Sequence, residues 1–549
     1  MAESIRELEK RLRASAASRP PLALTPAWFQ QRLFDWASSD PDFRVKLLRF
    51  VDVLPALRST RAVSDHVRQY FRGAHQPLIG ATTSIAAAPV FRPILSRVVR
   101  EGVFAMASRF IAGATPEEAI SALRDLAAHG VSYTVDLLGE ETLSDAEADA
   151  YLERYVQLVT TLADHAEELT PHGDTWANVP PVNISIKLSA LCPHLEPAAP
   201  RWVSQASVER LRTIMRAAMR HGAFVNFDME QYRNRELVET AFTDILLEPE
   251  FAAYPNAGIV VQAYLRNAEE QIARLREFAE RRGAPISVRL VKGAYWDEER
   301  IVAEQNGWPL PVYAIKRDTD DSYDRCTDAL LAAWPHLRPV FGTHNPWSVA
   351  QAVVKSRAAS IPDAEIEFQM LYGMAEGLRG AIAEMGLRTR VYVPIGQMIP
   401  GMAYLVRRLL ENTSNQAWFN AGASGIEKDG RDSSSAALFE RPGPQSSIGH
   451  DAAFDHDPLS AIQNSPPAAF FLSDTRARMY EALEARRGQF GAHYPLLIGD
   501  KQVSDRAETR VEYPAEPKTT AVGLVAQATR DDVHAAVTAA RSAYPAWRD

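Results

Sequence analysis

The chain has 549 residues, of which 46% are hydrophobic and 23% are charged. This composition is typical of a globular protein, and the length allows more than one hydrophobic core. The net charge is -9 and the Lys and Arg residues are scattered along the chain, so we expect no nucleic-acid binding.

The cysteines and the N-terminus bear on the compartment. Cys192 and Cys326 form no Cys-x-x-Cys or Cys/His spacing and cannot supply a disulfide framework. Residues 1–7 are charged and lack the apolar core of a signal peptide, and no stretch approaches the roughly 18 apolar residues of a membrane span. We expect a cytoplasmic protein whose only membrane contact would be peripheral.

Residues 1–125 are predicted to be helical. The segments with helical periodicity are 28–37, 43–53, 61–72 and 116–128. Because this region shows no alternation of strands and helices, we expect an arm or cap domain that packs against the next domain.

The region 126–415 repeats a short apolar strand followed by an amphipathic helix, which is the pattern of parallel βα units. The predicted strands lie near 131–138, 182–189, 224–230, 257–264, 286–293, 339–344, 366–371 and 390–396. The predicted helices include 146–169, 207–221, 267–282, 373–385 and 402–413. Eight such units predict an α/β fold, a (β/α)8 TIM barrel whose active site lies at the C-terminal ends of the strands.

One face of several predicted strands is polar. Because side chains alternate along a strand and the apolar face must meet the helices, the polar face is expected to point into the barrel. The residues on this face are Asn183, Ser185, Lys187, Asn226, Asp228, Glu230, Gln262, Arg289 and Gln369. A polar ligand at the top of the barrel would explain this pattern.

The fifth strand carries two cations in an apolar run, Arg289 and Lys292, followed by Gly293 and the aromatic Tyr295. Burying these cations costs free energy unless an anion or polar ligand pairs with them. The alternative is an edge strand with solvated cations.

Lys187 ends the second strand close to Asp228 and Glu230. Three roles are open for it: it can bind a substrate carboxylate, form a structural ion pair, or act as a Schiff-base amine. Lys292 could also act as a Schiff-base amine. A Schiff-base lyase or aldolase that uses Lys187 or Lys292 is therefore an alternative to a protein that binds an anionic ligand.

The helix after the eighth strand contains Arg407, Arg408 and Glu411. Adjacent arginines differ by about 100° around a helix axis, so both can reach a ligand along its flank, and paired guanidiniums suit a carboxylate. The alternative is one solvent-facing arginine and one paired with Glu411.

His344 follows the sixth strand within Thr343-His344-Asn345, where a turn residue and a catalyst are both possible. The sequence has no HExxH, GxSxG, P-loop or GxGxxG motif. We therefore expect no metal site, and any dinucleotide must be held by the barrel itself.

The C-terminal part divides in two. Residues 416–470 are rich in Gly, Ser, Asp and Pro and are predicted to be a linker. Residues 471–549 are predicted to contain helices at 474–487 and 530–542 and strands at 495–498 and 521–526. We expect this stretch to be an incomplete α/β segment.

Seven motifs occur in order over the barrel region: NISIKLSAL (183–191), FDME (227–230), VVQAY (260–264), VRLVKGAYWD (288–297), THN (343–345), EFQML (367–371) and YLVRRLLENTSN (404–415). With them the chain resembles the proline dehydrogenase domain of bacterial bifunctional proline utilization A proteins. The resemblance implies a distorted barrel that binds FAD and oxidises L-proline to Δ1-pyrroline-5-carboxylate, with hydride moving from proline C5 to flavin N5. It also implies a quinone acceptor and peripheral association with the inner membrane.

The resemblance also implies roles for individual residues. The carboxylate ligands would be Lys187, Arg407 and Arg408, and the residues around the proline ring would be Tyr295, Leu371, Tyr392 and Tyr404. Asp228 and Arg289 would be the catalytic pair. The FAD-binding residues would be Met229, Gln262, Arg289, Lys292, Gly293, Ala294, Thr343 and His344. Glu140 would close a gate by pairing with Arg407.

The chain departs from the family at residues 397–400, which read QMIP where relatives carry Thr-His-Glu. Its N-terminus has no recognisable ribbon-helix-helix module. Residues 512–549 resemble the opening of an aldehyde dehydrogenase domain but end before its catalytic residues, so we expect no second activity. An inactive flavin-binding remnant is a further alternative.

Overall fold

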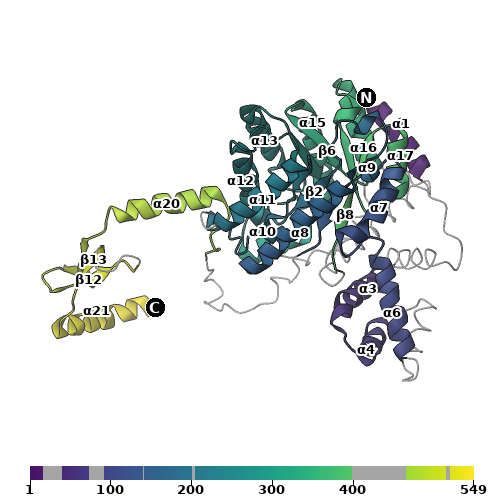
Figure 1. Ribbon diagram of the computed structural model, residues 1–549. Coiled ribbons are helices and arrows are strands. Elements are labelled where there is room, and N and C mark those ends of the chain that lie inside the picture. The colour runs from purple at the N-terminus through teal and green to yellow at the C-terminus, as the bar shows by residue number, and fades with distance from the viewer. Residues whose placement is uncertain are drawn as a thin grey trace. The chain divides into compact units, whose positions relative to one another are not determined.

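A computed structural model describes residues 1–16, 40–72, 92–139, 141–200, 205–397, 465–514 and 520–548. The chain forms two compact units, residues 1–467 and residues 468–549. The first unit contains a closed barrel of strands surrounded by helices (Figure 1). The predicted domain boundaries near residues 125, 415 and 470 stay predictions.

The barrel consists of eight parallel strands in sequence order, closed by pairing of the eighth strand with the first. This confirms the predicted fold class. The strands are β1 (Ser132–Leu137), β2 (Asn183–Ile186), β3 (Phe224–Phe227), β4 (Ala257–Gln262), β5 (Ile286–Val291), β6 (Leu337–Gly342), β7 (Glu367–Leu371) and β8 (Arg388–Ile395).

Helices surround the barrel on the outside. They are α8 (Asp145–Asp164), α9 (Ala166–Leu169), α10 (Leu188–Leu191), α11 (Gln205–Arg220), α12 (Arg235–Leu247), α13 (Ala268–Arg282), α14 (Trp296–Asn306), α15 (Lys316–Ala332), α16 (Pro346–Ala358) and α17 (Glu376–Glu384). Two helices, α14 and α15, follow β5. The predicted helix at 402–413 lies outside the described residues.

Alternation along β1 shows why these strands have two different faces. Tyr133 and Val135 point toward the helices and belong to the main hydrophobic core, whereas Thr134 and Asp136 lie on the opposite, inward face. Both faces are buried because the helices cover one and the closed barrel encloses the other.

The N-terminal helices pack in two places. Helix α1 (Ala2–Ala16) packs against α16 and α17, and its apolar side chains join the main core (Figure 1). The helices α3 (Pro41–Val53), α4 (Thr60–Phe71) and α6 (Arg92–Ala107) surround a second, smaller core. This core also contains Met374 and touches Leu371, so it meets the barrel at the C-terminal end of β7. Helix α7 (Pro116–Ala128) packs against β1.

A buried ion pair lies at the opposite, N-terminal end of β7 and β8. Arg390 is 1% exposed, and its guanidinium donates to both carboxylate oxygens of Glu367 at 2.7 and 3.0 Å. The same guanidinium donates to Ser132 Oγ and to the carbonyl oxygen of Tyr133. The cation therefore ties β8 to both of its neighbours in the barrel.

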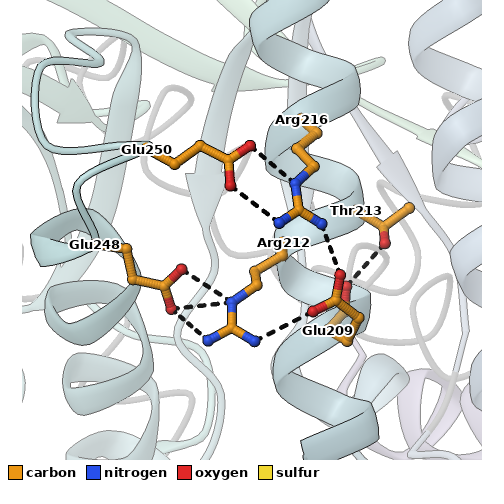
Figure 2. Close-up of polar contacts among 6 residues, drawn as sticks. All are labelled: Glu209, Arg212, Thr213, Arg216, Glu248 and Glu250. Atoms are coloured by element: carbon orange, nitrogen blue, oxygen red, sulfur yellow. Dashed lines mark hydrogen bonds and ion pairs between the residues drawn. The ribbon is translucent and has the colours of Figure 1, made fainter.

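A second ionic network lies on the surface (Figure 2). Arg212 of α11 contacts Glu248, Arg216 contacts Glu250, and both arginines contact Glu209. The network links α11 to the segment that follows α12. Because these groups are half-buried or exposed and are screened by solvent, we expect a small contribution to stability.

The second unit contains helices and short strands. Its elements are α20 (Ser473–Arg487), β9 (Ala492–Tyr494), β10 (Leu496–Ile498), β11 (Lys501–Val503), β12 (Glu508–Glu512), β13 (Ala521–Ala526) and α21 (Arg530–Arg548). The strands form a β10–β11 hairpin and a sheet in the order β12-β13-β9. Helix α21 continues to Arg548 and includes Pro545, so the predicted end at residue 542 was wrong.

Glu367→Gln is expected to destabilise the barrel, because it leaves the buried Arg390 cation without its counter-charge. Breaking a buried ion pair in this way costs about 3–5 kcal/mol of unfolding free energy. Burial opposes ionisation of Glu367, but Arg390 outweighs it and lowers the pKa of this carboxyl. A lowered folded-state pKa adds stability above the unfolded-state pKa, so the wild-type advantage should shrink as pH falls through the folded-state value.

Urea unfolding measured at several pH values checks this prediction. Glu250→Gln removes a carboxylate from the exposed network of Figure 2 and is the matched control. An equal effect of the two substitutions would contradict the structural importance assigned to the buried pair.

Candidate active site

Charged and polar side chains from five strands converge at the C-terminal mouth of the barrel. Asp228, which follows β3, is central to this group: it accepts from Arg289 Nη1 at 2.7 Å, Asn226 Nδ2 at 2.9 Å and the Tyr392 hydroxyl at 2.6 Å. Arg289 also donates to Ser185 Oγ at 3.1 Å. The mouth is therefore cross-linked between β2, β3, β5 and β8.

A second ion pair joins β1 to the end of β2. Lys187 Nζ contacts Asp136 Oδ1, and the side chains are 17% and 2% exposed, respectively. Burial of Lys187 favours the neutral amine, but the negative charges of Asp136 and other neighbours outweigh this effect and raise its pKa. Lys187 is thus held as an ammonium cation.

Tyr392 contributes a buried phenol to the mouth. Burial raises its pKa well above the ordinary value, and the nearby carboxylates of Asp136 and Asp228 act in the same direction. The hydroxyl therefore remains protonated and donates to Asp228. The Arg289 guanidinium lies 5.4 Å from the centre of the same ring, within cation–π distance.

Glu230 lies just beyond Asp228. Its Oε1 accepts from Ser189 Oγ at 2.8 Å, and burial raises its pKa. Its Oε2 has no hydrogen-bond partner among the described residues. Gln262 at the end of β4 donates to the carbonyl oxygens of Met229 and Glu230, which orders the backbone after β3.

The backbone after β5 makes a close turn. Gly293 has φ +124°, a backbone conformation that residues other than glycine rarely adopt. An added Cβ at this position would also lie 2.5 Å from the buried ring of Tyr264. Lys292 forms an ion pair with Asp320 of α15. Ala294 is exposed, and Tyr295 packs in a small cluster with Tyr264.

The residues after β6 form a hydrogen-bonded turn. Thr343 Oγ1 accepts from the backbone N–H of Asn345, whose side chain in turn caps α16. His344 Nε2 accepts from the backbone N–H of Leu371 at 3.0 Å. This hydrogen bond from Leu371 to the imidazole holds the end of β7 in place. The small N-terminal core meets the barrel at the same point.

Several predicted site residues lie outside the described residues. They are Glu140, Tyr404, Arg407 and Arg408. Their roles as gate, ring contact and carboxylate ligands stay predictions.

The residues around the mouth fit a flavin. Among the described residues, the side-chain atoms Gln262 Oε1 and Arg289 Nε are buried without a hydrogen-bond partner. They offer one acceptor and one donor, and a flavin ring edge presents both donors and acceptors.

Asp136, Tyr155 and Asp320 were not predicted from the sequence. Tyr155 of α8 accepts from the backbone N–H of Lys187 at 3.4 Å, and the two acids are the partners of the predicted lysines. Alternation along β1 places Asp136 on the same inward face as Thr134, so the sequence pattern could have predicted that Asp136 points into the barrel.

No three His, Cys, Asp or Glu side chains gather as a possible metal site within the described ranges. Within the same ranges no helix is both long enough and apolar enough to cross a membrane.

The fold and the mouth define a (β/α)8 barrel protein that presents paired cations and acids at the C-terminal ends of its strands. The family described as "Proline dehydrogenase" matches residues 119–421, and the one described as "Proline utilization A N-terminal domain" matches residues 2–110. The chain belongs to the proline dehydrogenase family.

Individual relatives agree with this assignment. The chain is 31% identical over 486 residues to "Bifunctional protein PutA" of Klebsiella aerogenes, covering 83% of this chain but 35% of that protein. It is 28% identical over 316 residues to "Proline dehydrogenase 1" of Bacillus subtilis (strain 168), covering 58% of this chain and 90% of the relative. The chain thus spans about a third of the length of the bifunctional relative.

A solved structure extends the similarity over the whole chain. The structure of proline utilization A from Bdellovibrio bacteriovorus, inactivated by N-propargylglycine, matches with a TM-score of 0.81 and 34% identity. The match covers 100% of this chain and 54% of that one.

Gly293→Ala is expected to disturb the turn after β5. The substitution adds both a backbone strain of about 1–3 kcal/mol and a clash with Tyr264, whose ring is fully buried. Gly283→Ala is the matched control, because its φ is also positive, +72°, but nothing lies within 4 Å of an added Cβ. Thermal unfolding should show the larger loss for Gly293→Ala; equal losses would mean that the clash with Tyr264 is relieved without cost.

Proposed function

We propose that this chain binds FAD and oxidises L-proline to Δ1-pyrroline-5-carboxylate. The observation that supports this most directly is the pair of buried, charge-balanced cations, Lys187 and Arg289, at the mouth of a proline dehydrogenase family barrel. A small amino acid needs cations near its carboxylate, and the mouth presents these two.

The proposed substrate contacts divide by chemistry. Lys187 binds the carboxylate together with Arg407 and Arg408, since ammonium and guanidinium groups donate strong hydrogen bonds to carboxylates. The ring packs against the side chains of Tyr295, Leu371, Tyr392 and Tyr404. Clamping the carboxylate orients the C5 hydrogen, which turns an encounter in solution into an aligned reaction within the site.

Asp228 and Arg289 form the proposed catalytic pair. Arg289 supplies fixed positive charge in a buried site, where it stabilises negative charge that develops nearby. Asp228 holds this guanidinium and the Tyr392 hydroxyl in place. Both acceptor oxygens of Asp228 are occupied in this way.

The proposed FAD ligands come from four strand ends. They are Met229, Gln262, Arg289, Lys292, Gly293, Ala294, Thr343 and His344. When bound, the flavin supplies hydride-accepting chemistry. Gln262 and Arg289 offer unpartnered polar atoms, and Thr343 and His344 belong to an ordered turn.

A Schiff-base lyase or aldolase is the weaker candidate. That chemistry needs a neutral amine, whereas the pKa of Lys187 is raised and its ammonium is paired with Asp136. Lys292 is likewise paired, with Asp320.

A quinone acceptor, a cytoplasmic location and peripheral association with the inner membrane belong to the proposal as well. They are supported by the resemblance to the family, and the electron acceptor is open to direct assay.

The visible spectrum of the purified protein after loading with FAD tests the function. Anaerobic L-proline should bleach the flavin band. Cyclopentanecarboxylate, which has the ring and carboxylate but no oxidisable C–N bond, should leave the band unreduced. Failure to bind FAD would contradict the proposal, and bound FAD that L-proline never reduces would favour the inactive remnant.

Arg407→Met should raise KM for L-proline while FAD remains bound. Losing a charged hydrogen bond of about 1.5–3 kcal/mol corresponds to a KM increase of roughly 10- to 150-fold. Arg276→Met, which alters an exposed arginine of α13, is the control. An unchanged KM would remove Arg407 from the carboxylate site.

A further inference from the structure

The partner of Lys187 is the feature of the mouth that the proposed reaction leaves without a role. Asp136 is almost completely buried, and its Oδ1 contacts the Lys187 ammonium. The two residues come from neighbouring strands, because Asp136 stands opposite Ser185 in the β1–β2 register. Lys187 lies two residues after Ser185, just beyond the end of β2 and at the mouth.

We propose that Asp136 is a positioning residue that keeps Lys187 charged and directed into the mouth for a substrate carboxylate. This inference rests on the proposed oxidation of L-proline. An ammonium group has three N–H donors, so Lys187 can contact Asp136 and a substrate carboxylate at the same time.

The surroundings of Lys187 make such a counter-ion necessary. The lysine side chain is largely enclosed, and burial by itself favours the neutral amine, which cannot bind a carboxylate by charge. Neighbouring elements contribute the other groups that influence its charge: Tyr155 from α8, and Asp228 and Glu230 after β3.

These other groups cannot take over the role of Asp136. Asp228 already accepts from Arg289, Asn226 and Tyr392. Glu230 accepts from Ser189 Oγ, and burial raises the pKa of the Tyr155 phenol, so Tyr155 stays uncharged. Asp136 is therefore the carboxylate available to pair with Lys187.

Asp136→Asn tests the charge with little change in shape. The pKa of Lys187 should fall in the variant, because burial remains and the main counter-charge is gone. The KM for L-proline relative to wild type should then rise with pH above the lowered pKa of Lys187. The kcat at saturating L-proline should change much less, since carboxylate binding is shared by ground state and transition state.

A chemical readout needs neither FAD nor turnover. Reductive methylation with formaldehyde and a borane modifies neutral amines, so Lys187 should react slowly in the wild-type protein and faster in Asp136→Asn. Each unit by which the pKa falls increases the neutral fraction about tenfold, and we expect at least that gain. Mass spectrometry of the peptides gives the extent at each lysine, and Lys292, paired with Asp320, is the internal reference.

Two further variants separate charge from stability. Asp136→Glu keeps the carboxylate and should retain slow methylation of Lys187 and a wild-type dependence of KM on pH. Glu367→Gln removes a buried carboxylate from the opposite end of the barrel and should leave both readouts unchanged, whatever its stability.

Unchanged methylation of Lys187 in folded Asp136→Asn would overturn the inference. Should that variant fail to fold, the wild-type protein still decides: rapid methylation of Lys187 at pH 8, as fast as at an exposed lysine, would equally overturn it. If wild type oxidises no L-proline but methylation changes as expected, the proposed function fails and the role of Asp136 in holding Lys187 charged stands.

Discussion

A closed barrel of eight parallel strands encloses its inward side chains, so a charged group inside it must find its counter-charge on another strand. This protein meets the requirement in separate pairs. At one end of the barrel Glu367 pairs with Arg390, and at the mouth Arg289 pairs with Asp228. An unpaired inward charge would cost several kcal/mol, a large part of the stability of an average domain.

The same pairs determine which groups remain available for a ligand. Asp228 accepts from three donors, so its carboxylate orients its neighbours. Tyr392 is kept protonated by its surroundings and so acts as a donor. Gln262 Oε1 and Arg289 Nε are among the buried atoms that have no hydrogen-bond partner in the described residues. Structural pairing and proposed cofactor binding thus use different atoms of the same side chains.

The barrel was predictable from the sequence because its strands are apolar and regularly spaced between amphipathic helices. Alternation also predicted the inward polar face that carries Lys187 and Arg289. The partners of the lysines were harder to find. Asp136 meets Lys187 only through the β1–β2 register, and Asp320 meets Lys292 through α15, a second helix after β5 that the repeating pattern did not predict.

The second unit was predicted less completely, for a related reason. Strand β12 reads ETRVE, and all five residues are exposed, so no buried face imposes a hydrophobic alternation on it. Strands β9 and β11 are three residues long, too short for a periodic signal. The strand β13, which is more apolar, was found at its observed position, residues 521–526.

Charge balance at the mouth bears on how a carboxylate is bound. The described residues supply two cations, each already paired: Lys187 with Asp136 and Arg289 with Asp228. A substrate carboxylate entering this balanced set would add a negative charge in a poorly solvated place, which is unfavourable without further positive charge. The proposed ligands Arg407 and Arg408 would supply it from the segment after β8. Under the proposed function, Lys187 would direct the carboxylate, and the two arginines would provide the net charge that makes its binding favourable.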